Sequence, residues 1–139
     1  MNQVPKEDDR CESFVRQIKQ LNCYRMFQND FELVHNSNES PQAWGLNSFQ
    51  SRNWNIKQAR MGKLSGLADY TVYYNKASED FARVACIEFK RSIAEIKQFE
   101  GGKFPNQLAF RERCLKLKIP YLLTCSEDEA VEFMKNLLK

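Results

Sequence analysis

The sequence is poor in the residues that build zinc sites and disulfide frameworks. It contains one histidine, His35, and none of its five cysteines is separated from another by the two to four residues of a zinc-binding pair. An odd number of cysteines without a secretory signal also argues against a set of disulfide bonds. We therefore expect the cysteines to be reduced thiols, buried as small apolar side chains.

Long hydrophobic runs and targeting segments are also missing. No apolar stretch approaches the roughly 20 residues needed to cross a bilayer. The N-terminal segment MNQVPKEDDR is too acidic and polar for a signal peptide. The chain shows no internal repeat, low-complexity tract or domain boundary. We therefore expect residues 1–139 to form one domain of an intracellular protein that is not inserted in a membrane.

Neither sign of charge dominates the sequence. Lysine and arginine number 21 against 18 aspartates and glutamates, which leaves a net charge of +3. This balance is compatible with nucleic-acid binding but does not require it, because proteins bind phosphate through local basic patches. With 42% hydrophobic and 28% charged residues, the composition is that of an ordinary globular protein.

Apolar residues at helical spacing predict three main helices. The first covers residues 7–21, with a buried stripe and acidic residues in its first turn, where the helix dipole favours them. The second covers residues 106–117. The third follows Ser126, which is predicted to be its N-cap, and Glu129 three residues later completes a capping box. A short further helix is expected around residues 54–61.

Four segments rich in β-branched and aromatic residues predict strands, at residues 31–35, 69–74, 83–89 and 121–124. The second and third are expected to pair antiparallel across a polar turn. Residues 36–55 are predicted to be a long polar loop, and residues 95–103 a mobile connector. The resulting order, αβββαβα, predicts an α/β fold in which a compact mixed sheet carries helices on both faces.

The most informative residues lie at the ends of the second and third predicted strands. In a strand, Glu88 and Lys90 project from the same face, while Phe89 points into apolar packing on the other. Asp69 begins the neighbouring strand, nineteen residues before Glu88 and just after a glycine turn at Gly66. We expect its carboxylate to reach the same place. Alternatively, Asp69 caps a strand, and Glu88 and Lys90 form an exposed pair near a sheet edge.

Two carboxylates beside one ammonium group predict a site for a hard divalent cation. Mg²⁺ or Mn²⁺ prefers carboxylate, carbonyl and water oxygens, so Asp69, Glu88 and the main-chain carbonyl of Phe89 would form part of its coordination shell. Lys90 would hold or deprotonate an attacking water and stabilise the developing negative charge. The pattern therefore favours metal-dependent hydrolysis of a phosphodiester.

Several ordered motifs resemble the VRR-NUC domain, a family of the PD-(D/E)XK (restriction-endonuclease-like) nuclease superfamily. The resemblance covers about residues 12–135 and is carried by Ala59-Arg60, Lys63, Gly66-Leu67-Ala68-Asp69, Ile87-Glu88-Phe89-Lys90, Asn106-Gln107 with Phe110, and Ser126-Glu127-Asp128-Glu129-Ala130. Ala68 stands where the family usually has proline, and Phe110 stands where tryptophan is common. Neither departure removes a catalytic group, although losing the proline should reduce rigidity.

The resemblance implies a restriction-endonuclease-like fold and a role for each motif residue. Asp69 and Glu88 would be metal ligands, Lys90 the catalytic lysine, and Gln107 a helix residue that reaches into the site. Glu12 matches an acidic position of the family's first helix and would be a further metal ligand, unless it is a solvated helix residue. Stand-alone members act as homodimers on branched DNA, including Holliday junctions. The resemblance therefore implies a homodimeric, Mg²⁺- or Mn²⁺-dependent endodeoxyribonuclease.

Basic residues flank these motifs and are candidates for DNA binding. Arg60, Lys63, Lys97 and Lys103 are predicted to contact phosphates in a salt-sensitive manner that is largely independent of sequence. His35 matches a looser family pattern near the site entrance, although a lone histidine beside a strand is more often structural. Two alternatives stay open. The chain could be a binding module of the same fold that does not cut, or a nuclease acting on RNA or on single-stranded ends.

Overall fold

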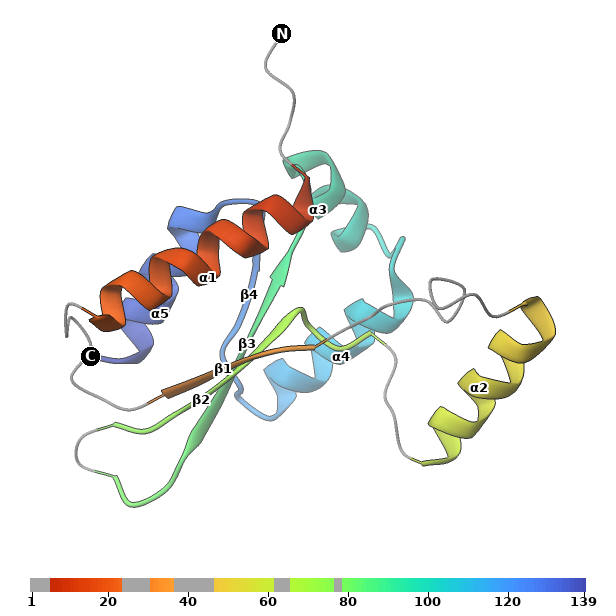
Figure 1. The fold of residues 1–139 in the computed structure, drawn as a ribbon, viewed down its shortest axis with the longest axis horizontal. Helices are drawn as coiled ribbons and strands as arrows, with labels where there is room; N and C mark the ends of the chain where they lie inside the picture. Colours follow the sequence, from red (N-terminus) through yellow and green to blue (C-terminus); the bar gives the residue numbers. More distant parts are fainter. Residues whose placement is uncertain (1–5, 24–30, 37–46, 62–65, 77–78) are drawn as a thin grey trace, which may run out of the picture.

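The computed structural model describes residues 6–23, 31–36, 47–61, 66–76 and 79–139. Its elements, in chain order (Figure 1), are α1 (Glu7–Cys23), β1 (Phe31–His35), α2 (Ser48–Arg60), β2 (Tyr70–Tyr74), β3 (Arg83–Phe89), α3 (Ile93–Glu100), α4 (Pro105–Lys116), β4 (Tyr121–Thr124) and α5 (Glu127–Leu137).

The four strands form one mixed sheet in the order β1-β2-β3-β4. β1 and β3 each pair antiparallel with β2, and β4 runs parallel to β3. The predicted antiparallel pairing of β2 with β3 is confirmed, with Tyr70 opposite Ile87. This register fixes where the polar residues at the ends of these two strands lie.

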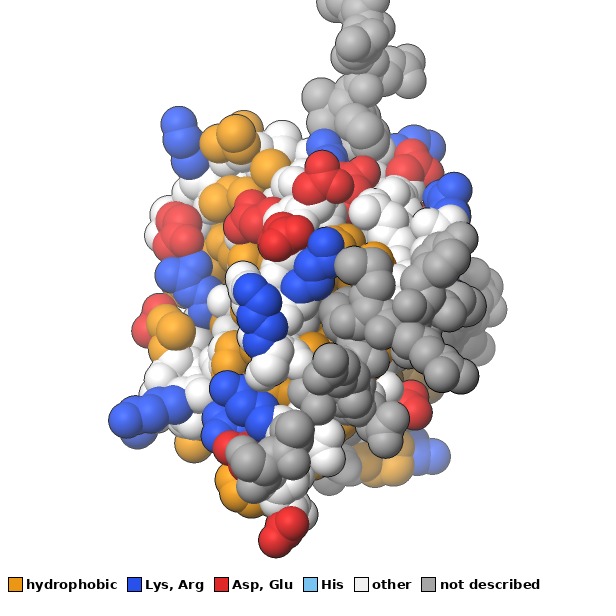
Figure 2. All heavy atoms as spheres, turned by 90° about the vertical axis from the view of Figure 1, so that its left-hand side faces the viewer, with side chains coloured by type: hydrophobic (Ala, Val, Ile, Leu, Met, Phe, Trp, Pro, Cys, Tyr) orange, Lys and Arg blue, Asp and Glu red, His pale blue; other side chains and the backbone are white. Residues whose placement is uncertain are grey.

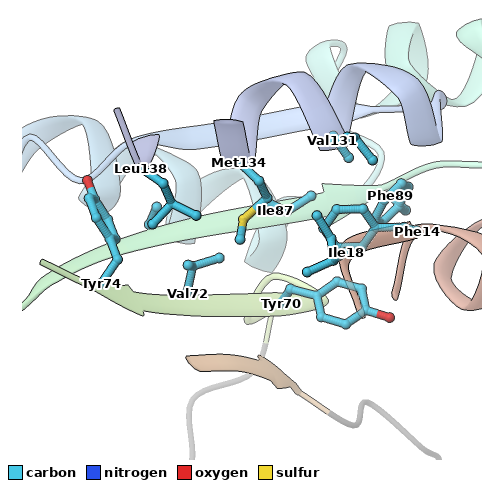
Figure 3. Close-up of a cluster of buried hydrophobic side chains, with 12 residues drawn as sticks. Phe14, Ile18, Tyr70, Val72, Tyr74, Ile87, Phe89, Val131, Met134 and Leu138 are labelled. Atoms are coloured by element: carbon cyan, nitrogen blue, oxygen red, sulfur yellow. The ribbon is translucent and has the colours of Figure 1, made fainter. Parts of the chain in front are cut away.

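One face of the sheet packs against α1 and α5, which lie side by side (Figure 1). Phe14 of α1 and Met134 of α5 are fully buried against the inward residues Val72, Ile87 and Phe89 (Figure 3). Burial of each such side chain stabilises the fold by roughly 1.5–3 kcal/mol. The predicted apolar stripe of the first helix is therefore the stripe that forms this core.

The opposite face of the sheet packs against α4. Ala68 and Cys86 are buried there against Cys114, with Phe110 and Tyr121 at the edge of the cluster. The predicted α/β class, with a mixed sheet and helices on both faces, is thus confirmed. The alternation in β3 is also confirmed, because Cys86 faces α4 while Ile87 and Phe89 face the other core.

Two predictions about connecting segments were wrong. The segment predicted as a mobile connector forms α3, which Ser92 caps by accepting a hydrogen bond from the main-chain N–H of Glu95, and which buries Phe99. Gly101 ends α3 as its C-cap, so the glycine pair marks a helix end. The loop predicted for residues 36–55 is helical from Ser48 onward, and residues 37–46 lie outside the described residues. Figure 1 shows α2 standing away from the sheet.

The capping box predicted at the start of α5 forms only in part. Ser126 is the N-cap and accepts a hydrogen bond from the N–H of Glu129, as predicted. The carboxylate of Glu129 instead accepts from the hydroxyl of Thr124, and that hydroxyl in turn accepts from the N–H of Ser126. Thr124, the last residue of β4, therefore mediates the second half of the motif.

The cysteines described in the structure are all free thiols, which agrees with the expectation of reduced side chains. Cys86 and Cys114 are buried, while Cys11 and Cys125 are half-buried. The side chain of Cys23 lies outside the described residues. In the described part of the chain, no helix is both long enough and apolar enough to cross a membrane.

Candidate metal and nuclease site

The polar residues singled out in the sequence meet where β2 begins and β3 ends. Asp69 immediately precedes β2, Glu88 is the last residue but one of β3, and Lys90 follows that strand. Because Tyr70 lies opposite Ile87, Asp69 lies opposite Glu88. Asp69, Glu88 and Lys90 are 9%, 1% and 4% exposed, respectively. The alternative in which Glu88 and Lys90 form an exposed pair is therefore wrong.

Main-chain groups of the two strands hold both carboxylates. The main-chain N–H of Asp69 donates to Oε2 of Glu88 at 3.1 Å. The N–H of Phe89 donates to Oδ2 of Asp69 at 2.7 Å. Each carboxylate is thus fixed by the backbone of the opposite strand, so strand pairing itself orients the two acids. A carboxylate oxygen that accepts one such hydrogen bond keeps a second lone pair for another partner.

Lys90 links these strands to α4. Its Nζ lies 3.0 Å from Oε1 of Glu88 and donates to Oε1 of Gln107 at 2.6 Å. Gln107 is in the first turn of α4, which begins at Pro105. Proline is favoured at the first position of a helix because an N–H there would have no hydrogen-bond partner within the helix. The structure therefore brings Gln107 together with Asp69, Glu88 and Lys90.

Burial opposes the negative charge of both acids. It is the largest cause of the raised pKa of Glu88, to about 8, and the neighbouring Asp69 raises this pKa further while Lys90 lowers it. The pKa of Asp69 is also raised, by burial first, against the opposing effects of the Phe89 N–H and Lys90. One ammonium group thus faces two buried carboxylates, and a second cation at this place would relieve their repulsion.

Glu7, in the first turn of α1, interacts electrostatically with the site and was not predicted from the sequence. Burial raises its pKa to about 7, Asp69 raises it further, and Lys90 lowers it. Asp8 in turn contributes to the raised pKa of Asp69. The first-turn acids were interpreted only as partners of the helix dipole.

Glu12, the residue of α1 predicted as a metal ligand, is exposed. It lines a groove of about 1190 Å³ between α1 and β1, together with Cys11, His35 and Tyr70. His35 is exposed at the end of β1, with its ring centroid 5.0 Å from that of Tyr70, and its charge lowers the pKa of Asp69. His35 therefore lies close enough to affect the pKa of Asp69. In α1, Asp8 also affects the pKa of Asp69, and Asp69 affects the pKa of Glu7.

The predicted DNA-binding residues are spread over several elements. Lys97 of α3 and Lys103 in the α3–α4 connection are exposed, and Nζ of Lys103 lies 5.6 Å from the ring centroid of Phe104, beside the site. Arg60 is exposed at the end of α2, and Lys63 lies outside the described residues. Figure 2 shows acidic and basic side chains interspersed on one face of the molecule, with a group of acidic ones near its upper middle.

Comparisons with protein-family models, with curated proteins and with solved structures found no match for this chain.

The side-chain oxygens of this cluster are donors of the kind that hard divalent cations prefer. Mg²⁺ keeps several waters and is commonly bound through one or two carboxylates together with substrate phosphates. Asp69 and Glu88 could supply two carboxylates, and the main-chain carbonyl of Phe89 could supply a further oxygen. Among the residues that the structure describes, no group of three or more histidine, cysteine, aspartate or glutamate side chains could hold a metal ion.

Proposed function

We propose that this protein is a metal-dependent nuclease that hydrolyses phosphodiester bonds in DNA. The observation that carries the proposal is the buried cluster of Asp69, Glu88 and Lys90, to which α4 adds Gln107. Buried charges destabilise a fold unless they are paired, and structural roles seldom require two acids beside one lysine at the open end of a strand pair. Such perturbed clusters are commonly functional sites.

Asp69, Glu88 and the carbonyl of Phe89 would hold Mg²⁺ or Mn²⁺. When bound, the ion would supply a water of lowered pKa and charge stabilisation on the phosphate. Burial is the main reason that the pKa of both acids is raised, and a bound cation would offset this effect by favouring their charged forms. Glu7, whose pKa responds to Asp69 and Lys90, is the candidate for a third acid.

Lys90 would act on the reacting groups directly. Glu88 and Gln107 hold its Nζ from two sides, which limits the positions of a side chain that is otherwise flexible. Its remaining N–H can point to the attacking water or to a phosphate oxygen, where it would orient the nucleophile and stabilise negative charge. Gln107 can only accept this hydrogen bond through Oε1, so its own amide group is left to donate to substrate.

We propose branched DNA, such as a Holliday junction, as the substrate, and a homodimer as the active species. Both follow from the resemblance to the VRR-NUC family. The exposed Lys97 and Lys103 support phosphate binding near the site. The described part of the chain carries one such cluster, so symmetric cleavage of two strands would require a second copy.

The test is a cleavage assay of the purified protein on junction, flap, duplex and single-stranded DNA and on RNA, with Mg²⁺, Mn²⁺ or EDTA. We expect metal-dependent cleavage of branched DNA, and a fall of at least about 100-fold in Asp69→Asn and Lys90→Ala. Asp80→Asn and Lys116→Ala, which change exposed residues elsewhere, are the matched controls.

The outcomes separate the proposal from its rivals. Binding of junctions without cleavage under any metal would indicate a non-cutting binding module. Cleavage confined to RNA or single-stranded ends would replace the substrate while keeping the site. Full activity in Asp69→Asn or Lys90→Ala would overturn the site itself, provided that circular dichroism shows both variants folded.

A further inference from the structure

Lys90 has aromatic as well as polar neighbours. Besides its contacts to Glu88 and Gln107, its Nζ lies 4.1 Å from the ring centroid of Phe104 and 5.7 Å from that of Phe99. The first distance places the ammonium close over the ring face, where the negative quadrupole of the ring attracts a cation. The attraction is stronger in a desolvated site, and the Lys90 side chain is only 5% exposed.

The position of Phe104 makes this contact more than incidental. Phe104 is the N-cap residue of α4. N-caps favour serine, threonine, aspartate and asparagine, because a side-chain oxygen can accept a hydrogen bond from an N–H of the first helical turn. A phenylalanine side chain has no such oxygen, so the side chain of Phe104 does not cap the helix, although its carbonyl accepts from the N–H of Leu108. Its ring instead covers the lysine of the site, three residues before Gln107 on the same helix.

Phe99 supports the ring arrangement from α3. Its side chain is fully buried, and its ring centroid lies 6.4 Å from that of Phe104, with the planes inclined by 37°. Arg111 of α4 also pairs with Glu100 of α3, which ties the two helices together. Helix α3, which was not predicted from the sequence, thus supplies the second aromatic ring near Lys90.

We infer that Phe104 is a positioning residue, whose ring holds the ammonium of Lys90 against Glu88 and Gln107. The catalytic part of this inference rests on the proposed nuclease activity, whereas the contact between ring and ammonium does not. Glu88 and Gln107 fix the ammonium through two hydrogen-bonding directions, and the ring closes a third side. Without the ring, Lys90 keeps its charge but samples positions away from the reacting groups.

The test compares Phe104→Leu with Phe104→Tyr. Leucine keeps an apolar side chain but has no ring face, and tyrosine keeps the ring. Phe133→Leu makes the same change in α5, at the edge of the other core, and is the matched control. We expect Phe104→Leu to lower kcat about 10- to 30-fold with little change in KM, and Phe104→Tyr to restore it.

Fluorinated phenylalanines at position 104 separate positioning from folding. Fluorine withdraws electron density from the ring face and weakens its attraction for a cation while almost preserving its shape. A stepwise fall in kcat with increasing fluorination is expected, and a merely structural role predicts a constant kcat. This series also tests the positioning role of Phe104 in the event that Phe104→Leu does not fold.

A measurement that needs no substrate can test the contact between Phe104 and Lys90 even if the protein is not a nuclease. The ring should shift the Lys90 ε-methylene protons upfield in an NMR spectrum, and the shift should be lost in Phe104→Leu and kept in Phe104→Tyr. An unchanged shift in Phe104→Leu would overturn the contact. A lost shift with unchanged kcat, in an active enzyme, would overturn the positioning role. An inactive wild type that shows the expected shifts would overturn the nuclease proposal and support the contact.

Discussion

At the scale of single residues, Glu88 combines deep burial with a neighbouring acid. Its folded-state pKa of about 8 lies above its ordinary value of 4.5. Between these two values the folded protein keeps a proton that the unfolded chain has released, so stability falls as pH rises through this window. The site is therefore maintained at a cost to the metal-free fold that increases toward alkaline pH.

Glu88→Gln should remove this pH dependence. We expect the melting temperature of the variant, relative to the wild type in EDTA, to be higher at pH 8.5 than at pH 5, because only the wild type must hold a buried carboxylate at position 88 at the higher pH. Thermal melts at the two pH values measure the difference. Mg²⁺ should raise the melting temperature of the wild type at pH 8.5 and leave the variant almost unchanged. A variant whose relative stability fell with pH would contradict the assignment of the raised pKa.

Gly66 is the residue that allows the segment before Asp69 to approach α4. It has φ +81, and a Cβ there would lie 2.4 Å from the main-chain carbon of Asn106 and 2.7 Å from the nitrogen of Gln107. Both contacts are to main-chain atoms, which cannot rotate out of the way as a flexible side chain could. The glycine turn noted in the sequence therefore sets the distance between β2 and the helix that carries Gln107.

Gly66→Ala should separate Gln107 from Lys90 and destabilise the protein by more than about 2 kcal/mol, since it adds a clash to the cost of a left-handed conformation. Gly102→Ala is the matched control, because Gly102 has φ +91, yet in the part of the chain that the structure describes nothing lies within 4 Å of its Cβ position. Urea denaturation of both variants measures the difference. Equal losses of stability would show that the close approach to α4 is unimportant.

At the scale of elements, α1 presents two candidate acids to the site from different turns. Glu7 is half-buried with a pKa that responds to Asp69 and Lys90, whereas Glu12 is exposed and lines the groove beside β1. The family resemblance favours Glu12, whereas the dependence of the Glu7 pKa on Asp69 and Lys90 favours Glu7. The two assignments can be separated by the same change at each position.

We expect Glu7→Gln to weaken Mg²⁺ binding and lower cleavage about 10-fold or more, and Glu12→Gln to have a smaller effect on both. Calorimetric titration with Mg²⁺ and initial cleavage rates provide the two measurements. A larger effect of Glu12→Gln on metal binding would restore the assignment made from the sequence.

The elements that the sequence predicted best are those in which a local signal and tertiary packing agree. The bounds of β1, β3 and β4 match the prediction. In β3 the apolar residues coincide with buried positions, whereas the apolar residues of β1 and β4 are at most half-buried. α3 was missed because Gly101 and Gly102 were given more weight than Ser92, although the serine begins the helix and the first glycine only ends it. Glu7 was missed for a different reason. Its role depends on where α1 crosses the sheet, which no local pattern encodes.

At the scale of the whole molecule, the proposed function requires two copies of one small chain. The described part of the chain brings together one pair of acids with one lysine, and a four-way junction presents two equivalent strands for cleavage. A two-fold dimer would place identical sites on those strands. A monomer would release nicked junctions, whereas a dimer would cut both strands during one encounter.

Light scattering at working concentrations should therefore give the mass of a dimer. Mixed dimers of wild-type and Asp69→Asn chains, purified by two affinity tags, should cut one strand and accumulate nicked product, because only one of their two sites can bind metal. Homodimers of the variant should cut neither strand, and wild-type homodimers should resolve the junction. A monomeric mass together with symmetric resolution would contradict the dimer but not the proposed metal site, since Asp69, Glu88 and Lys90 meet within a single chain.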